Sequence, residues 1–191
     1  MTNETIRGYV TLVDEGGNPV GCGEKISVHE KGLLHSAFSI VLMDVLENDL
    51  ENNDLETLLI PNSAVPSRVL LQKRQIDKYH SGGLWSNACC GHPKPGENIL
   101  DAAHRRLLEE LGIAVALQPA GTTTYRLDVG GGLIEHEWNS IFVGQLSEKT
   151  PLFPNESEIS HLKWVDYSWL KKDLLQNPKE YSAWLPWIVS A

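Results

Sequence analysis

The amino-acid sequence predicts an α+β or α/β domain in which several strands surround one well-defined helix. That helix is expected over residues 99–111, where Asn98 can cap the first turn and Gly112 ends the last. Strand-like segments, with alternating or continuous apolar residues, occur both before and after it. A length of 191 residues favours a single domain over residues 1–191, because two full domains would need more chain.

The remaining elements are expected in chain order around this helix. Strands are expected at residues 7–13, 36–43, 68–72, 123–129, 133–143 and 162–165. Residues 14–19 form a turn rich in Gly, Asn and Pro. Residues 44–66 are acidic and Asn-rich and end in two prolines, which predicts an exposed loop excursion within the domain. The last twenty residues form a Trp-rich tail that is expected to be helical.

The composition excludes several classes of protein. Acidic residues outnumber basic ones by 25 to 16, for a net charge of -9, which argues against a nucleic-acid-binding protein with a basic face. There is no apolar run of the length that a membrane-spanning helix needs, and the first residues lack the basic-then-apolar layout of a secretory signal. Cysteines are few, and two of the three are adjacent, so we expect a reducing, cytoplasmic setting.

The most specific pattern runs along the predicted helix and the loop before it. Its spacing is Gly91-x5-Glu97-x7-Arg105-Arg106-Leu107-x-Glu109-Glu110-x-Gly112-Ile113. This resembles the Nudix box, in which a helix sets carboxylates beside a loop so that they hold Mg²⁺ against a diphosphate. A simpler interpretation is a solvated amphipathic helix with Arg105–Glu109 and Arg106–Glu110 as i,i+4 ion pairs.

One departure from the Nudix box bears on the chemistry. Arg106 stands where the box has a glutamate, so one acid is replaced by a cation. The replacement weakens the binding of several metal ions, which Nudix-style hydrolysis needs. The edited box therefore predicts a relative of the Nudix enzymes that binds a diphosphate without cleaving it.

Histidines and carboxylates elsewhere in the chain form a candidate metal site. Its members are His29, His35, His92, Glu135 and Glu137. Along a strand, Glu135 and Glu137 would share a face and His136 would point away. Imidazole and carboxylate together suit Zn²⁺, Mn²⁺ or Fe²⁺ better than Ca²⁺. Taken singly, each histidine is more typical of a surface or hydrogen-bonded residue, and the five residues come from distant segments.

The surroundings of His92 connect these segments to a known family. The string Trp85-Ser-Asn-Ala-Cys-Cys-Gly-His-Pro93 is similar to the W-T-N-x-x-C-G-H-P signature of type 1 isopentenyl-diphosphate isomerases. Further matches follow in chain order over roughly residues 7–190: Lys25 and His29, Leu34-His35-Ser-Ala-Phe-Ser, Arg74, Lys78, Tyr125-Arg126, Glu135-x-Glu137 and Pro186-Trp187. The departures are Ser86 and a longer segment between His35 and Arg74, and neither removes a proposed catalytic group.

The resemblance implies a fold, an activity and catalytic residues. The fold would be an α/β sandwich, a Nudix-like mixed β-sheet core flanked by helices. The family interconverts isopentenyl and dimethylallyl diphosphate by adding one proton and removing another. By this resemblance Cys90 and Glu137 are catalytic groups that face each other across the substrate, and Tyr125 lies beside the reacting carbons.

The resemblance also implies how metal and substrate are held. The three histidines with Glu135 and Glu137 would bind one Zn²⁺ or Mn²⁺, and Glu110 would help hold Mg²⁺ on the substrate diphosphate. The diphosphate would contact a set of cations: Lys25, Arg74, Lys78 and Arg106. Trp187 would form an aromatic wall of the pocket. The expected partner is a small isoprenoid diphosphate, and the protein would be a monomer or homodimer.

The residue types suit this reaction. An unactivated alkene is a very weak base, so its protonation needs a strong acid close by, such as a metal-bound carboxylic acid or a Tyr–Glu pair. A Trp face can stabilise the resulting cation, and a dry pocket prevents its capture by water. Other interpretations remain: Cys90 could be a small buried apolar residue, as we expect for Cys89, and Trp187 could fill the core.

Two further functions are compatible with parts of the sequence. One is a Nudix hydrolase of a nucleoside diphosphate derivative, against which Arg106 argues. The other is a non-catalytic module with a structural metal, against which the combination of Cys90 and Glu137 argues. A structural zinc site would also be closed, with four protein ligands.

Overall fold

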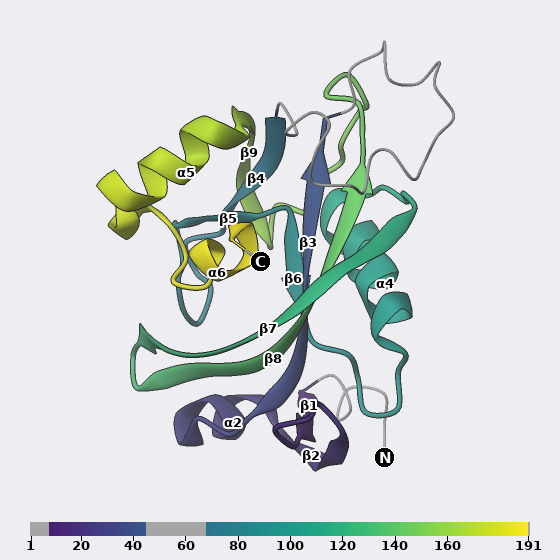
Figure 1. Ribbon diagram of the computed structural model, residues 1–191, viewed down its shortest axis with the longest axis vertical. Coiled ribbons are helices and arrows are strands. Elements are labelled where there is room, and N and C mark those ends of the chain that lie inside the picture. The colour runs from purple at the N-terminus through teal and green to yellow at the C-terminus, as the bar shows by residue number, and fades with distance from the viewer. Residues whose placement is uncertain (1–7, 45–67, 191) are drawn as a thin grey trace.

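The computed structural model describes residues 8–44 and 68–190, and its strands form one mixed β-sheet with helices on both faces (Figure 1). The strands are β1 Tyr9–Val13, β2 Pro19–Glu24, β3 His35–Met43, β4 Arg68–Arg74, β5 Trp85–Asn87, β6 Cys89–Gly91, β7 Leu117–Gly130, β8 Leu133–Gln145 and β9 Ile159–Asp166. The helices are α2 Lys25–Lys31, α4 Ile99–Leu111, α5 Tyr167–Gln176 and α6 Leu185–Val189, with a 3-10 turn at Pro178–Glu180. The α+β class predicted from the sequence is confirmed.

Strand β3 is the centre of the sheet. It pairs antiparallel with β1, β4 and β6, and parallel with β8 over its whole length. Strand β8 also forms a long antiparallel hairpin with β7, while β4 pairs with β5 and β9. The segments that carry the candidate site residues are thereby brought onto adjacent strands.

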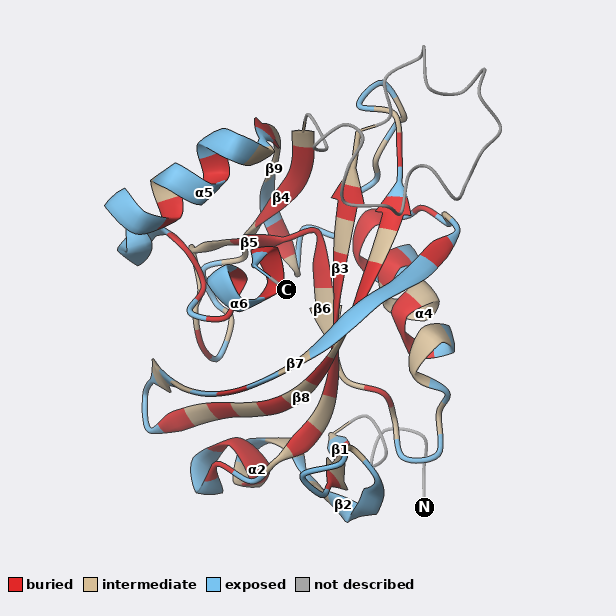
Figure 2. Ribbon diagram, in the orientation of Figure 1, coloured by how far each residue is buried: buried red, intermediate tan, exposed pale blue. Residues whose placement is uncertain are grey.

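Helix α4 has the boundaries that the sequence predicts. The Asn98 side chain accepts hydrogen bonds from the backbone N–H groups of Leu100 and Asp101, at 2.9 and 3.3 Å. Gly112 ends the helix with a φ of 68°, a left-handed conformation that favours glycine. Leu107 is fully buried in the core between α4 and the sheet, so the polar side of the helix is left for the site (Figure 2).

The opposite face of the sheet is covered by the C-terminal helices. Because successive strand residues point to opposite faces, Leu70 faces the core under α4, whereas Val69 and Leu71 face α5 and α6. Leu170 of α5 and Leu185 of α6 are completely buried against them. The two cores on either side of one sheet form the predicted sandwich.

The expected strands are all present, with β7 and β9 longer than predicted. Four short elements were not predicted: strands β2, β5 and β6 and helix α2. Helix α2 also lacks the usual signal, because its cap, Glu24, is not among the usual capping residues. The C-terminal tail is only partly helical: α5 ends at Gln176, Pro178 begins the 3-10 turn, and Pro186 lies in the first turn of the short helix α6. The excursion predicted at 44–66 falls almost wholly outside the described residues, and the single domain over 1–191 stays a prediction.

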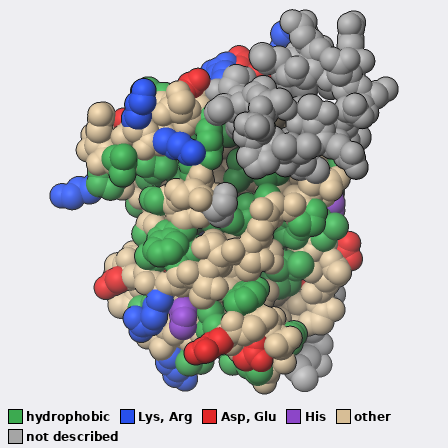
Figure 3. All heavy atoms as spheres, viewed as in Figure 1, with side chains coloured by type: hydrophobic (Ala, Val, Ile, Leu, Met, Phe, Trp, Pro, Cys, Tyr) green, Lys and Arg blue, Asp and Glu red, His purple; other side chains and the backbone are tan. Residues whose placement is uncertain are grey.

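The surface agrees with the acidic composition. On the face seen in Figure 3, Lys and Arg side chains are scattered among acidic ones and do not gather into one basic area. Within residues 8–44 and 68–190, none of the helices has the length and apolar character needed to cross a bilayer.

Candidate active site

The register of three adjacent strands brings the two glutamates of the E-x-E motif to the centre of the site. Glu137 of β8 lies beside His35 of β3 on one side and beside Tyr125 of β7 on the other. Glu135 and Glu137 are both buried on the same face of β8, as their spacing predicts. His136 points away, and its Nδ1 lies 2.9 Å from the carbonyl oxygen of Gly32, the residue that ends α2.

Helix α2 supplies His29. The side chain of Glu24 caps the helix by accepting from the N–H groups of Ile26 and Ser27, at 3.1 and 2.8 Å. Lys25 and His29 are one turn apart, and the His29 Nδ1 lies 2.6 Å from the Lys25 carbonyl oxygen. This contact turns the His29 Nε2 toward Glu135.

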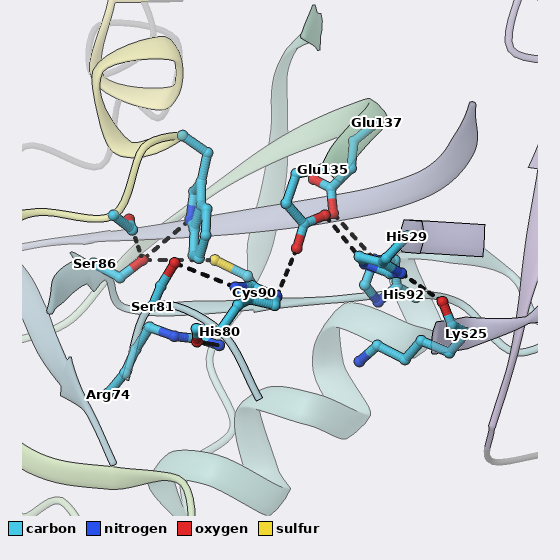
Figure 4. A network of polar contacts seen from close by, with 12 residues as sticks. Lys25, His29, Arg74, His80, Ser81, Ser86, Cys90, His92, Glu135 and Glu137 are labelled. Atoms are coloured by element: carbon cyan, nitrogen blue, oxygen red, sulfur yellow. Dashed lines mark hydrogen bonds and ion pairs between the residues drawn. The ribbon is translucent and has the colours of Figure 1, made fainter. Parts of the chain in front are cut away.

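Three histidines and Glu135 form a tight cluster. The nearest ligand atoms of His29, His35, His92 and Glu135 all lie within 4.8 Å of one another. Glu137 adjoins the cluster, with its Oε1 3.0 Å from His92 Nε2 and 3.9 Å from His35 Nε2. Four of the five predicted ligands are thus gathered, with the fifth at their edge. Figure 4 shows His29, His92, Glu135 and Glu137 side by side.

The donor set of this cluster fits a divalent metal ion. Backbone carbonyls accept from Nδ1 of His29 and His35, at 2.6 and 2.9 Å, so the Nε2 lone pair of each ring faces the cluster. Burial lowers the pKa of His35 to about 4, so this ring is neutral at pH 7. His29 Nε2 and Glu135 Oε2 are buried without a well-aligned hydrogen-bond partner. A cation between these atoms would satisfy them, and imidazole with carboxylate suits a transition metal or zinc.

The two buried carboxyl groups differ in their electrostatics. Burial and the neighbouring Glu135 carboxylate raise the pKa of Glu137 well above its usual range. Burial acts in the same direction on Glu135, but its close polar contacts with His29 and His80 outweigh burial and lower the pKa of Glu135. The pair therefore contains one carboxylate suited to bind a cation and one group able to hold a proton.

The far oxygen of Glu137 is held by two donors. The Tyr125 hydroxyl donates to Glu137 Oε2 at 2.5 Å, and the Asn139 side-chain amide donates to the same oxygen at 2.9 Å. Asn139 also donates to the Tyr125 oxygen at 3.0 Å. Because two donors converge on Oε2, Tyr125 and Glu137 form a fixed pair at the cavity wall.

The two adjacent cysteines occupy different environments. In β6 the Cys89 side chain is fully buried in the core under α4, whereas Cys90 lines the cavity. The Cys90 thiol donates to Asn87 Oδ1 at 3.0 Å, and the Asn87 amide donates to the carbonyls of Ile40 and Cys89, at 3.1 and 2.7 Å. Burial raises the pKa of Cys90 to about 11, so it is a thiol at neutral pH.

A single cavity of about 560 Å³ connects these groups to the predicted diphosphate contacts. The predicted residues that line it are Lys25, Arg74, Lys78, Cys90, His92, Arg106, Glu110, Tyr125, Glu135 and Glu137. Arg106 is paired with Glu109 and Glu110, and Lys78 with Glu158. The Arg74 Nε is a buried donor without a partner, and an anion in the cavity would satisfy it.

Trp184 is the tryptophan that lines this cavity. It is 4% exposed, its Nε1 donates to Ser86 Oγ at 3.1 Å, and the Arg74 guanidinium lies 5.2 Å from its ring centre. Trp187, the predicted wall, is 46% exposed and is not among the lining residues. Its ring centre is 6.1 Å from that of Tyr125, so it lies at the outer side of the same tyrosine.

Several residues of the site were not singled out in the sequence. They are His80, Asn87, Asn139, Glu158 and Trp184. Asn139 could have been found, since it follows Glu137 by two residues on the same strand face. Asn87 stands within the cysteine–histidine signature. His80 and Glu158 had no local pattern, because only the folded chain brings them to the cavity.

Comparison with known proteins identifies the family of the chain. A family model described as a NUDIX domain matches residues 59–187. An isopentenyl-diphosphate Delta-isomerase 2 of Aromatoleum aromaticum is 42% identical over 176 residues, which cover 92% of this chain and 82% of the relative. The chain belongs to the isopentenyl-diphosphate Delta-isomerase family. A second member, from Serratia proteamaculans, is 40% identical over 91% of this chain and 84% of its own length.

Solved structures place this isopentenyl-diphosphate Delta-isomerase family member in the Nudix fold. The Deinococcus radiodurans protein DR0079 superposes with a TM-score of 0.70 at 14% identity, over 95% of this chain and 97% of the other. A MutT protein of Methanosarcina mazei gives a TM-score of 0.54 at 15% identity, over 82% of this chain and 91% of the other. At such low identity these likenesses concern the fold alone.

Proposed function

We propose that the protein is an isomerase that interconverts isopentenyl diphosphate and dimethylallyl diphosphate by protonating and deprotonating the alkene. The observation that carries this proposal is that Cys90 and the Tyr125–Glu137 pair line one cavity together with four cations, Lys25, Arg74, Lys78 and Arg106. An isoprenoid diphosphate has matching parts, an apolar five-carbon unit and a doubly phosphorylated anionic end. Family membership at about two-fifths identity supports the same activity.

The cations that line the cavity suit the diphosphate. Lys25, Arg74, Lys78 and Arg106 supply positive charge, and the unpartnered Arg74 Nε supplies a free donor. Glu110, which is 4% exposed, lines the same cavity beside Arg106 and would hold Mg²⁺ that arrives with the substrate. With the diphosphate bound by these cations, we expect the hydrocarbon part to lie beside Cys90 and Glu137.

The reaction needs two proton-transfer groups on opposite sides of the five-carbon unit. One side gives a proton to the terminal alkene carbon, which leaves a tertiary cation. The other side removes a proton from the carbon two bonds away, so the double bond moves and the atoms of the substrate are unchanged. We infer that the Tyr125–Glu137 pair and the Cys90 thiol, which line the same cavity, provide these two groups.

The cation formed between these steps must be protected. A tryptophan ring over a desolvated cation is worth about 0.5–2 kcal/mol, and Trp184 lines the cavity. Exclusion of bulk water by the bound substrate would prevent hydration of the cation.

The histidine–glutamate cluster would hold one Zn²⁺ or Mn²⁺ through His29, His35, His92, Glu135 and Glu137. When bound, the ion would supply positive charge that makes the adjoining carboxyl group a stronger acid. Backbone hydrogen bonds to His29 and His35 orient these rings for that role.

The alternative, hydrolysis of a nucleoside diphosphate derivative, is less well supported. Arg106 occupies a box position where hydrolases carry an acid, and its guanidinium is paired with Glu109 and Glu110. Fewer carboxylates are therefore free to bind the metal ions of hydrolysis. Release of phosphate or nucleoside monophosphate from such substrates would favour this alternative.

The decisive experiment follows isomerisation in deuterated water by NMR. The purified protein with Mg²⁺ and Zn²⁺ should convert isopentenyl diphosphate to dimethylallyl diphosphate and incorporate deuterium. Cys90→Ala and Glu137→Gln should each reduce turnover by at least about 100-fold, the usual range for loss of a general acid or base. Cys22→Ala, at an exposed cysteine, is the matched control and should retain full activity. Near-normal turnover of either active-site variant would show that its assigned role is wrong.

A second measurement tests the two metal functions. Metal content should be one ion in the histidine–glutamate cluster without substrate, with additional Mg²⁺ bound in the presence of a non-reactive diphosphate analogue. Glu110→Gln should remove only the additional Mg²⁺. No extra Mg²⁺ with the analogue would contradict the second function.

A further inference from the structure

A fourth histidine, His80, lies beside the metal-binding cluster and has no part in the scheme above. It belongs to the loop between β4 and β5, is 7% exposed and lines the cavity. Its Nε2 lies 2.8 Å from Glu135 Oε1, while the other oxygen of Glu135, Oε2, lies 3.2 Å from His29 Nε2. The carboxylate is therefore held between two histidines, one inside the cluster and one outside it (Figure 4).

The direction of the His80 contact follows from its partners. The contact is close, but it lacks the alignment of a well-formed hydrogen bond. A carboxylate oxygen only accepts, so we expect the hydrogen on His80 Nε2, the nitrogen that lies nearest Glu135. In the neutral ring Nδ1 is then an acceptor, and the Ser81 hydroxyl lies 3.2 Å from it. Ser81 has a φ of 51°, and among the described residues it is the one residue other than glycine with a positive φ. The loop thus adopts an uncommon backbone conformation at the residue that fixes the His80 ring.

Neighbouring side chains hold the His80 ring and backbone in place. The Trp184 ring meets the His80 ring edge to face at 5.6 Å between centres, and the Tyr79 ring does so at 4.3 Å. Arg74 donates from Nη2 to the His80 carbonyl oxygen at 3.3 Å. The two aromatic rings thus pack against the His80 ring, the Ser81 hydroxyl lies at its Nδ1, and the Glu135 carboxylate lies at its Nε2.

We propose that His80 is a positioning residue that orients Glu135 for metal binding. By its 2.8 Å contact with Oε1, His80 holds the carboxylate so that Oε2 faces His29 and His35. Ligands whose outer atoms are held by hydrogen bonds bind metals more tightly, because less orientation is lost on binding. This inference shares one assumption with the proposed function, namely that His29, His35, His92 and Glu135 bind a metal ion.

The test measures Zn²⁺ affinity of the metal-free protein by competition with a chromophoric chelator. His80→Phe keeps a flat ring without a donor, and it should weaken Zn²⁺ binding by about 10- to 100-fold, as loss of such an outer partner does. His80→Gln can place an amide N–H near the position of Nε2 and should restore most of the affinity. His161→Phe, at an exposed histidine of β9, is the matched control and should leave the affinity unchanged.

A further variant separates the hydrogen bond from packing. Ser81→Gly suits the positive φ and removes only the hydroxyl behind the ring, so the loop should fold and Zn²⁺ affinity should fall less than in His80→Phe. Thermal unfolding of each metal-free variant identifies any loss of fold. If His80→Phe were unfolded, Ser81→Gly and His80→Gln would still report on the contact.

The outcomes are distinguishable. A folded His80→Phe that binds Zn²⁺ as tightly as the unmodified protein overturns the positioning role. So does a His80→Gln as weak as His80→Phe, because the loss would then come from packing. An unmodified protein that isomerises the substrate but binds no Zn²⁺ overturns the metal site, whereas one that binds Zn²⁺ without isomerising overturns only the proposed function.

Discussion

Removal of the Asn139 amide tests whether the Tyr125–Glu137 pair must be held in place. Asn139 is 1% exposed, and its Nδ2 donates to Glu137 Oε2 at 2.9 Å and to the Tyr125 oxygen at 3.0 Å. Its own Oδ1 has no partner. Asn139→Leu has nearly the same volume, removes both donated hydrogen bonds and removes the unsatisfied oxygen as well.

The magnitude follows from these contacts. Glu137 becomes a carboxylate when it gives its proton to the alkene, and a hydrogen bond to a charged group contributes about 1.5–3 kcal/mol, with each 1.4 kcal/mol about tenfold in rate. If the lost bond acts fully in the transition state, kcat/KM falls by roughly 10- to 150-fold. The free energy of unfolding should change less, by about 1–2 kcal/mol, because the Tyr125–Glu137 bond remains and an unsatisfied polar atom is lost.

The assay is the rate of conversion of isopentenyl diphosphate at low substrate, followed by NMR, with urea unfolding measured in parallel. Asn177→Leu is the control, since Asn177 is exposed and lies outside the cavity. Asn139→Asp, which has the same shape but adds an acceptor, should be at least as impaired as Asn139→Leu. A kcat/KM within threefold of the unmodified protein in folded Asn139→Leu would refute the reasoning, because Tyr125 and Glu137 would then orient themselves.

Three more outcomes are expected. Zn²⁺ at 100 times its Kd should stabilise the metal-free protein by about 2.7 kcal/mol and raise its Tm by roughly 5–10 °C, and chelation should reverse this in a thermal scan. Glu97→Gln should lower the free energy of unfolding at pH 7 by roughly 1–3 kcal/mol, because Arg105 donates to Glu97 at 2.7 and 2.9 Å. The Arg105 hydrogen bonds lower the pKa of Glu97 below 4.5 in the folded protein. The stabilisation by this ion pair is therefore present above pH 4.5 and is lost as the pH falls through the folded pKa. Urea unfolding at pH 7 and pH 3 should show that the stability difference between the unmodified protein and Glu97→Gln is smaller at pH 3. Leu107→Ala, in the buried core, should cost about 2–5 kcal/mol in urea unfolding, whereas Leu108→Ala, at a position 58% exposed, should cost less than about 1 kcal/mol.

The helix of the Nudix box shows how far local sequence reaches. Asn98 and Gly112 are a cap and a stop whose effects depend on neighbours in the chain, so the boundaries of α4 are correct to the residue. The pairing of Arg106 with Glu110 was also foreseen, since the two residues are one helical turn apart. Helix α2 has only seven residues and an uncommon cap, and its short pattern was not recognised although it carries His29.

The sequence by itself determined the class of fold, the main helix, the common face of Glu135 and Glu137, and the family to which the motifs belong. These depend on periodicity, caps and spacing, which are properties of a single segment. Only the tertiary structure decided that β3 and β8 pair in parallel with His35 beside Glu137, and that Trp184 and His80 reach the cavity. Such neighbours are set by strand register and by the packing of a loop and a C-terminal helix against the sheet. No local pattern encodes these contacts, because they join residues tens of positions apart.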